Sequence, residues 1–198
     1  DLGRSHELKN MGDIDTQDAR RTTPNPQRDK DASVLGKVVV RPNADQKHTF
    51  TVEHVDKKAD YQLYTARTAP PVTAAAAVID SGATTDMKRT RGSWAGEWRN
   101  LSAPVFDDIK ASLSYQNADS REFIYEDRLT AADRTRDVTY QEKTWQANVQ
   151  ASKLLRSDAG LAQKITYGID YVRSDVENLQ TGITPPVGET FPLKRFPD

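Results

Sequence analysis

Apolar and polar side chains alternate one by one along several separate stretches of this chain. In the clearest stretch, residues 109–116, the odd positions are Ile, Ala, Leu and Tyr and the even positions are Lys, Ser, Ser and Gln. Successive side chains of a β-strand point to opposite faces of a sheet, so this period predicts strands with one apolar and one polar face. A chain built from such stretches is expected to be all-β.

The alternation predicts about six to seven strands in one antiparallel meander. In the first strand, Val34, Val38 and Val40 share a face with Gly36, while Lys37 points to the other side. The strands that can be bounded are Asp31–Arg41, Lys47–Lys57, Arg89–Arg99, and those around residues 109–116, 145–151 and 164–171.

Short and long connections are expected to alternate between these strands. Tight turns are predicted near Asn43, Ser102 and Asp158, where Pro, Asn, Asp and Gly favour turn geometry. Short turns on the periplasmic edge and long loops on the outer edge are typical of outer-membrane barrels, whereas long loops are uncommon inside compact soluble domains. The predicted outward-facing loops are Asn10–Asp29, Tyr61–Asp86, Ala118–Asp137 and Gln180–Asp198.

The composition favours strands in a membrane over a packed soluble core. Only 36% of residues are hydrophobic and 29% are charged, which leaves few side chains for a conventional core. No apolar run approaches the roughly 18 residues of a membrane-spanning helix. The strand faces mix Trp and Tyr with small residues, as expected where rings lie at a lipid–water boundary. We therefore expect an antiparallel transmembrane β-barrel segment, with the inner face of a soluble β-sandwich as the alternative.

The charges and motifs argue against nucleic-acid binding and against catalysis. The 28 basic and 29 acidic residues nearly cancel, and no basic face alternates with aromatic residues. The chain has no cysteine, so it forms neither disulfides nor thiolate metal sites. The charged segment from Glu126 to Arg136 lacks a nucleophile or glycine-rich phosphate loop and is interpreted as a solvated, mutually paired loop. We expect no enzyme activity and no nucleic-acid partner.

Several short blocks, in their order along the chain, resemble the TonB-dependent haem and haemoglobin receptors of the Gram-negative outer membrane. The similarity covers nearly the whole chain as spacing plus these blocks. They are Thr23–Gln27, Phe50–Val55, Glu126–Arg128, Thr130–Arg136, Gly188–Pro192 and Lys194–Pro197.

The resemblance implies a place and a role for the chain. In that family a plug domain precedes a large barrel, and the TonB complex contacts the plug from the periplasm. Neither a plug nor a closing strand with a terminal aromatic residue is recognisable in residues 1–198, so the resemblance implies a partial barrel. Its lipid-facing side would contact the bilayer of the outer membrane, and its outer loops would contact haem or haemoglobin during haem import.

The histidines do not form a haem or metal site by themselves. The family's haem ligands are histidines, one of them in a loop between an FRAP-like and an NPNL-like motif. Asn25–Gln27 matches the second motif only in part and has no adjacent histidine. His48 and His54 are about 20 Å apart along one strand, so they cannot share a metal, and both are interpreted as interfacial residues. His6, beside Glu7, is the one candidate loop ligand. The resemblance therefore places the haem ligands outside this chain.

Two alternatives remain open from the sequence. A ferric-siderophore receptor of the same class would have loops of the same kind. A secreted, soluble, β-rich binding module, such as an adhesin domain, would show the same alternation without a membrane.

Overall fold

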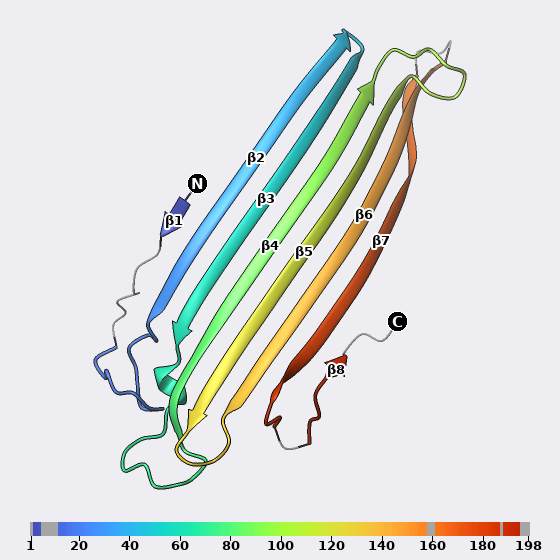
Figure 1. Ribbon diagram of the computed structural model, residues 1–198. Helices are drawn as coiled ribbons and strands as arrows, with labels where there is room; N and C mark the ends of the chain where they lie inside the picture. The colour runs from blue at the N-terminus through green and yellow to red at the C-terminus, as the bar shows by residue number, and fades with distance from the viewer. Residues whose placement is uncertain (1, 5–11, 158–160, 187, 195–198) are drawn as a thin grey trace.

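The computed structural model describes residues 2–4, 12–157, 161–186 and 188–194, and these form one antiparallel sheet (Figure 1). Eight strands follow each other in the sheet in their order along the chain, and every pair of neighbours is antiparallel. The all-β, antiparallel meander is therefore confirmed. The strands are β1 Leu2–Arg4, β2 Gln27–Asn43, β3 Gln46–Gln62, β4 Val78–Trp98, β5 Asp108–Arg128, β6 Arg134–Arg156, β7 Ala162–Ile183 and β8 Leu193–Lys194, with a short 3-10 helix, η1, at Tyr64–Ala66.

The six central strands are about twice as long as the alternation indicated. Each of β2 and β3 has 17 residues, and β6 has 23. Much of each predicted long loop is therefore strand: β4 already starts at Val78, and between β5 and β6 only residues 129–133 remain as a connection. The predicted loops Tyr61–Asp86 and Ala118–Asp137 were therefore too long. The predicted loops Asn10–Asp29 and Gln180–Asp198 were also too long, because β2 and β7 extend into them.

The physical reason is that both faces of these added strand segments are polar. Alternation vanishes there, yet the backbone ladder continues and cross-strand charges stabilise it. Arg121 on β5, for example, donates through Nε and Nη2 to the Asp137 carboxylate on β6, at 2.9 and 2.6 Å. A polar sequence was thus mistaken for a loop.

The connections at one end of the sheet are of unequal length. The turn at residues 44–45 is tight, as predicted, and the Asn43 carboxamide accepts a bond from the Asp45 N–H at 3.0 Å. The link near Ser102 occupies residues 99–107, with positive φ at Asn100 and Ser102, so the tight turn predicted there was wrong. The turn predicted at Asp158 lies outside the described residues. At the opposite end lie residues 12–26, 63–77, 129–133, 184–186 and 188–192 (Figure 1).

The sheet is a single layer without a conventional core. Among described residues, only Ala77 and Ala151 are buried hydrophobic side chains. The accessible surface is 13646 Å² for a 22.1 kDa chain, whereas a compact protein of that mass exposes roughly 9,300 Å². In the described part of the chain, no helix has the length and apolar character needed to span a bilayer. No described segment of the chain therefore covers the exposed apolar side chains of this sheet.

Candidate membrane-facing surface and polar face

The strand register aligns the apolar side chains of six strands into rows. Along one row, the pairs Val38–Phe50, Phe50–Trp94 and Trp94–Leu113 are direct neighbours on β2 to β5. Because side chains two residues apart share a face, the rows above and below carry more of the same kind. We call this surface the apolar band; its rows are Gly36, Val52, Gly92, Tyr115, Trp145, Arg173; Val38, Phe50, Trp94, Leu113, Ala147, Tyr171; Val40, His48, Gly96, Ala111, Val149, Ile169; and Gln46, Trp98, Ile109, Ala151, Tyr167.

The apolar band occupies the end of the sheet next to residues 44–45 and 99–107. We call this end the turn half; it comprises residues 35–43, 46–53, 91–98, 108–116, 144–156 and 162–174, and the remainder of β2 to β7 is the loop half. Many side chains of the apolar band are uncovered: Ile169 is 71% exposed and Val52 is 60% exposed. The band is interrupted by the polar or charged Gln46, His48 and Arg173.

Aromatic rings lie near both limits of the band. Toward the loop half, Tyr115 and Trp145 contact each other with ring centroids 4.6 Å apart. Toward the turns lie Trp98 and Tyr167, and the Tyr167 hydroxyl donates to the Val105 carbonyl at 2.7 Å. An indole or phenol at such a position keeps its ring in the apolar layer and its polar group at the water boundary.

The height of the apolar face differs between the strands. The four rows of the apolar band, from Trp145 to Ala151 on β6, are six residues long, and along β6 the same face continues to Leu155 past Lys153, whose ammonium binds Asp107 at 2.7 Å. At about 3.4 Å per residue and a strand tilt of about 40°, the four rows give roughly 16 Å and the longer stretch on β6 gives roughly 26 Å, against about 25 Å for the lipid-facing band of known barrels. Beyond Trp145 the same face becomes polar, since its next residues toward the loop half are Lys143 and Gln141.

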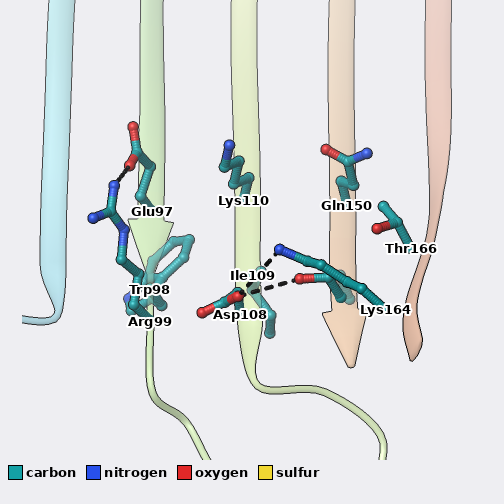
Figure 2. A pocket seen from close by; sticks show the side chains of 11 residues that line it. Glu97, Trp98, Arg99, Asp108, Ile109, Lys110, Gln150, Lys164 and Thr166 are labelled. Atoms are coloured by element: carbon teal, nitrogen blue, oxygen red, sulfur yellow. Dashed lines mark hydrogen bonds and ion pairs between the residues drawn. The ribbon is translucent and has the colours of Figure 1, made fainter. Parts of the chain in front are cut away.

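The opposite face of the turn half is mostly polar, with Leu35, Val39, Leu154 and Val172 as exposed apolar exceptions. Glu97 on β4 accepts from Lys47 Nζ at 3.0 Å and from Arg99 Nη2 at 2.8 Å, and Arg89 binds Glu53. Near the turns this face contains a shallow cavity of about 390 Å³, shown in Figure 2. Three side chains within that cavity interact: Asp108 accepts from Ser152 at 3.3 Å and lies 3.9 Å from Lys164 Nζ.

The two described histidines both lie on β3 and on the apolar side of the sheet. His48 stacks on Trp94 at a centroid distance of 6.1 Å and meets the edge of Trp98 at 5.3 Å. These rings surround Gly96, where a Cβ would lie 2.6 Å from the Trp98 ring. His54 Nδ1 is 2.9 Å from the Thr90 hydroxyl. Neither histidine belongs to a metal-binding group of described residues, and His6 lies outside the described part of the chain.

The segments at the loop end pack against each other. Asn25 exchanges two hydrogen bonds with Thr65: its amide donates to the hydroxyl at 3.0 Å, and its carbonyl accepts from the Thr65 N–H at 3.2 Å. The guanidinium groups of Arg21 and Arg67 lie 5.1 and 4.4 Å from the Tyr64 ring centroid. Residues 12–26 and 63–77 thus form one ordered surface. Sequence reasoning missed this contact because nothing in either segment marks its partner.

Several charges beside the connection at residues 129–133 are paired. Glu126 on β5 bridges Arg128 and Arg134 at 3.5 and 3.4 Å, and Asp133 accepts from the Arg128 N–H at 2.9 Å. Glu126 therefore offsets part of the basic charge of this segment.

Asp18 makes residues 12–26 sensitive to acid. Its buried carboxylate accepts from the Arg20 side chain at 2.7 and 3.0 Å and from the Arg20 N–H at 2.8 Å. These bonds to Arg20 hold the pKa of Asp18 well below its ordinary value of 3.8. A carboxyl with a lowered pKa stabilises the folded loop above its unfolded pKa, and this contribution is lost as the pH falls below that value.

We expect acid to open residues 12–26 locally. The protection factor of the Arg20 amide, which is the exchange rate of an unstructured amide at the same pH divided by its own, should stay constant between neutral pH and about pH 4 and fall below that range. In Asp18→Asn the protection factor should be low already at neutral pH and should change little with acid. An acid response unchanged in Asp18→Asn would assign it to another group.

Comparison with known proteins gives no family for this chain. No family model matches the sequence, and no curated protein matches it. The function is therefore inferred from the geometry of the two sheet faces and from the sequence resemblance.

Proposed function

We propose that this chain is part of the wall of an outer-membrane receptor barrel, in which the apolar band faces lipid and the polar face lines the lumen. The observation that carries the proposal is the apolar band itself. Its apolar side chains and its aromatic rings near both limits fit a bilayer-facing surface, which is roughly 16 Å high across the six strands and continues to roughly 26 Å along β6. The polar face directly behind it fits a wet interior.

The open borders of the sheet support the same proposal. Among described residues, β2 is paired on its outer side only at Lys30–Ala32, and β7 only at Leu179–Gln180. Long unpaired strand edges with an uncovered apolar face favour aggregation in water. A closed barrel removes both edges, because further strands pair with them. A soluble binding module would have no lipid to cover the apolar band and no further strands to pair with these edges.

The transported ligand is proposed from the resemblance. Haem or haemoglobin would contact the outer surface formed by residues 12–26, 63–77, 129–133, 184–186 and 188–192, and transport would depend on the TonB complex. The long strands support contact with such a ligand, because their loop halves would hold that surface above the bilayer. A ferric siderophore is the second ligand that this class of receptor imports.

Single cysteines test which face meets lipid, since the natural chain has none. An environment-sensitive fluorophore on Ile169→Cys should emit at shorter wavelength in liposomes and be quenched by spin-labelled acyl chains. The matched neighbour Asp170→Cys should report water and resist this quenching, because adjacent strand residues point to opposite faces. Equal quenching at the two positions would contradict the proposal.

Haem binding by residues 1–198 alone is expected to be weak or absent, because the resemblance places the histidine ligands elsewhere. A haem titration of this segment, followed by the Soret band, should show no saturable shift. The intact receptor should show one. A saturable shift in the segment that is lost in His6→Ala would move the ligand site into this chain.

A further inference from the structure

The connection between β4 and β5, residues 99–107, folds back onto the apolar side of the sheet. It is held there by β6 and β7: Lys153 Nζ donates to the Ala103 carbonyl at 2.7 Å, and the Tyr167 hydroxyl donates to the Val105 carbonyl at 2.7 Å. Tyr167 belongs to the last row of the apolar band, and Lys153 lies on the same face of the sheet. The connection therefore reaches past β5 and lies beside the band at the turn end (Figure 1).

We propose that residues 100–106 insert into the periplasmic leaflet of the outer membrane, at the boundary between lipid headgroups and acyl chains. This inference rests on the proposed function, because it takes the apolar band as the lipid-facing side and the turn end as the periplasmic end. It adds a second membrane contact, which is made by a connection instead of a strand face, and it names lipid as the partner of this segment.

The part of the connection that would enter the leaflet carries no charge. Residues 100–106 are Asn, Leu, Ser, Ala, Pro, Val and Phe. Val105 is 61% exposed and Leu101 is 38% exposed, although both side chains are apolar. An uncharged segment with exposed apolar side chains, placed next to a lipid-facing surface, is stabilised at the membrane interface by burying those side chains.

The connection neutralises Lys153, the cation that interrupts the apolar face of β6. The Lys153 ammonium donates to Asp107 Oδ1 at 2.7 Å, and the second oxygen of that carboxylate accepts from the Leu154 N–H at 2.8 Å. Only 22% of the Lys153 side chain and 29% of the Asp107 side chain are exposed. A charged group beside lipid is tolerated where it is paired and covered by protein. The connection thus supplies both the counter-ion and the cover that Lys153 needs on a lipid-facing side.

The connection also lies where the apolar band needs to be extended. The four rows of the band are roughly 16 Å high, against about 25 Å for the apolar layer around known barrels. Beyond the last row, Leu155 on β6 and Ile165 on β7 continue the same face and are 45% and 48% exposed. Together with Val105 they form a turn-side margin of the band, so a bilayer that covers the full height of the face reaches the connection.

The exposed apolar surface of this margin suits a bilayer better than a protein partner. Each partner of a stable protein complex buries about 800 Å². The partly exposed side chains of Leu101, Val105, Leu155 and Ile165 fall well short of that area. A lipid leaflet needs no minimum contact area here, since it is continuous with the lipid that covers the band.

A fluorophore on Val105→Cys of the full-length receptor in liposomes tests the insertion. Its emission should shift to shorter wavelength. A spin label near the headgroup end of the acyl chains should quench it more strongly than a label near the terminal methyl, because interfacial segments lie about 5–10 Å into the boundary. Ala44→Cys is the matched control, since Ala44 is exposed at the same end of the sheet. It should be quenched at least about threefold less, because the turn that contains Asp45 stays in water.

Quenching of Val105→Cys no stronger than that of Ala44→Cys would overturn the proposal. A shift to shorter wavelength without quenching would also overturn it, because a protein surface would then cover the connection. The fluorophore at Ile169→Cys reports separately whether the band meets lipid. If Ile169→Cys is quenched and Val105→Cys is not, only this inference fails; if neither is quenched, the proposed function fails with it.

Discussion

Replacing Val149 by arginine is expected to destabilise the membrane-inserted protein by about 2–4 kcal/mol, the cost of a cation near the bilayer midplane on the lipid face of a barrel. Val149 lies in the middle of the apolar band and is 46% exposed, so the new side chain would not displace a packed core. Leu113→Arg, in the adjacent row, lies one row from the Tyr115–Trp145 limit as Val149 lies one row from the Tyr167 limit, so its cost should be similar. Reversible denaturant unfolding of the full-length protein in liposomes measures both.

Ser112→Arg is the matched control for these two substitutions. Ser112 precedes Leu113 on β5 and points to the polar face, where Lys110 and Gln150 already lie in water. Its substitution is expected to cost well under 1 kcal/mol, as for most exposed polar positions. If Ser112→Arg were as costly as Val149→Arg, the apolar band would not be the lipid-facing side and the membrane assignment would fail.

Most of the turn half could be predicted from the sequence because most of its strands have one apolar and one polar face; β2, with Leu35 and Val39 on the side of Lys37, departs from this pattern. Residues 109–116 alternate without exception, and the structure places them inside β5 with the expected faces. The turn at residues 44–45 was equally readable from Pro42, Asn43 and Asp45. In this half, the alternation within a single strand is enough to predict which of its side chains share a face.

The loop half could not be predicted in the same way, because both of its faces are polar. Residues 118–128 resemble a loop when read alone, and they become a strand through partners elsewhere in the chain, such as Gln141 Nε2, which donates to Asp119 at 2.6 Å. Local patterns do not contain cross-strand register.

Gly168 is expected to be a position that does not tolerate a methyl group. It lies on β7 opposite Gln150, and a Cβ built there would be 2.5 Å from the Val149 carbonyl oxygen of β6. That contact is with backbone, so it is relieved only if β6 and β7 move apart and their ladder bonds lengthen. Overpacking of this kind costs about 1–3 kcal/mol, which sets the expected loss for Gly168→Ala in the same liposome unfolding measurement.

Gly92 separates this clash from the general effect of adding a side chain to a strand. It also lies in the turn half, on β4 with a partner strand on each side, but a Cβ there would meet nothing within 4 Å. Gly92→Ala should leave stability unchanged or raise it by roughly 0.5–1 kcal/mol, since alanine loses less backbone entropy on folding than glycine. The two substitutions add the same methyl group to the same kind of strand. A loss in Gly168→Ala no larger than in Gly92→Ala would therefore show that the β6–β7 spacing at this position differs from the one described.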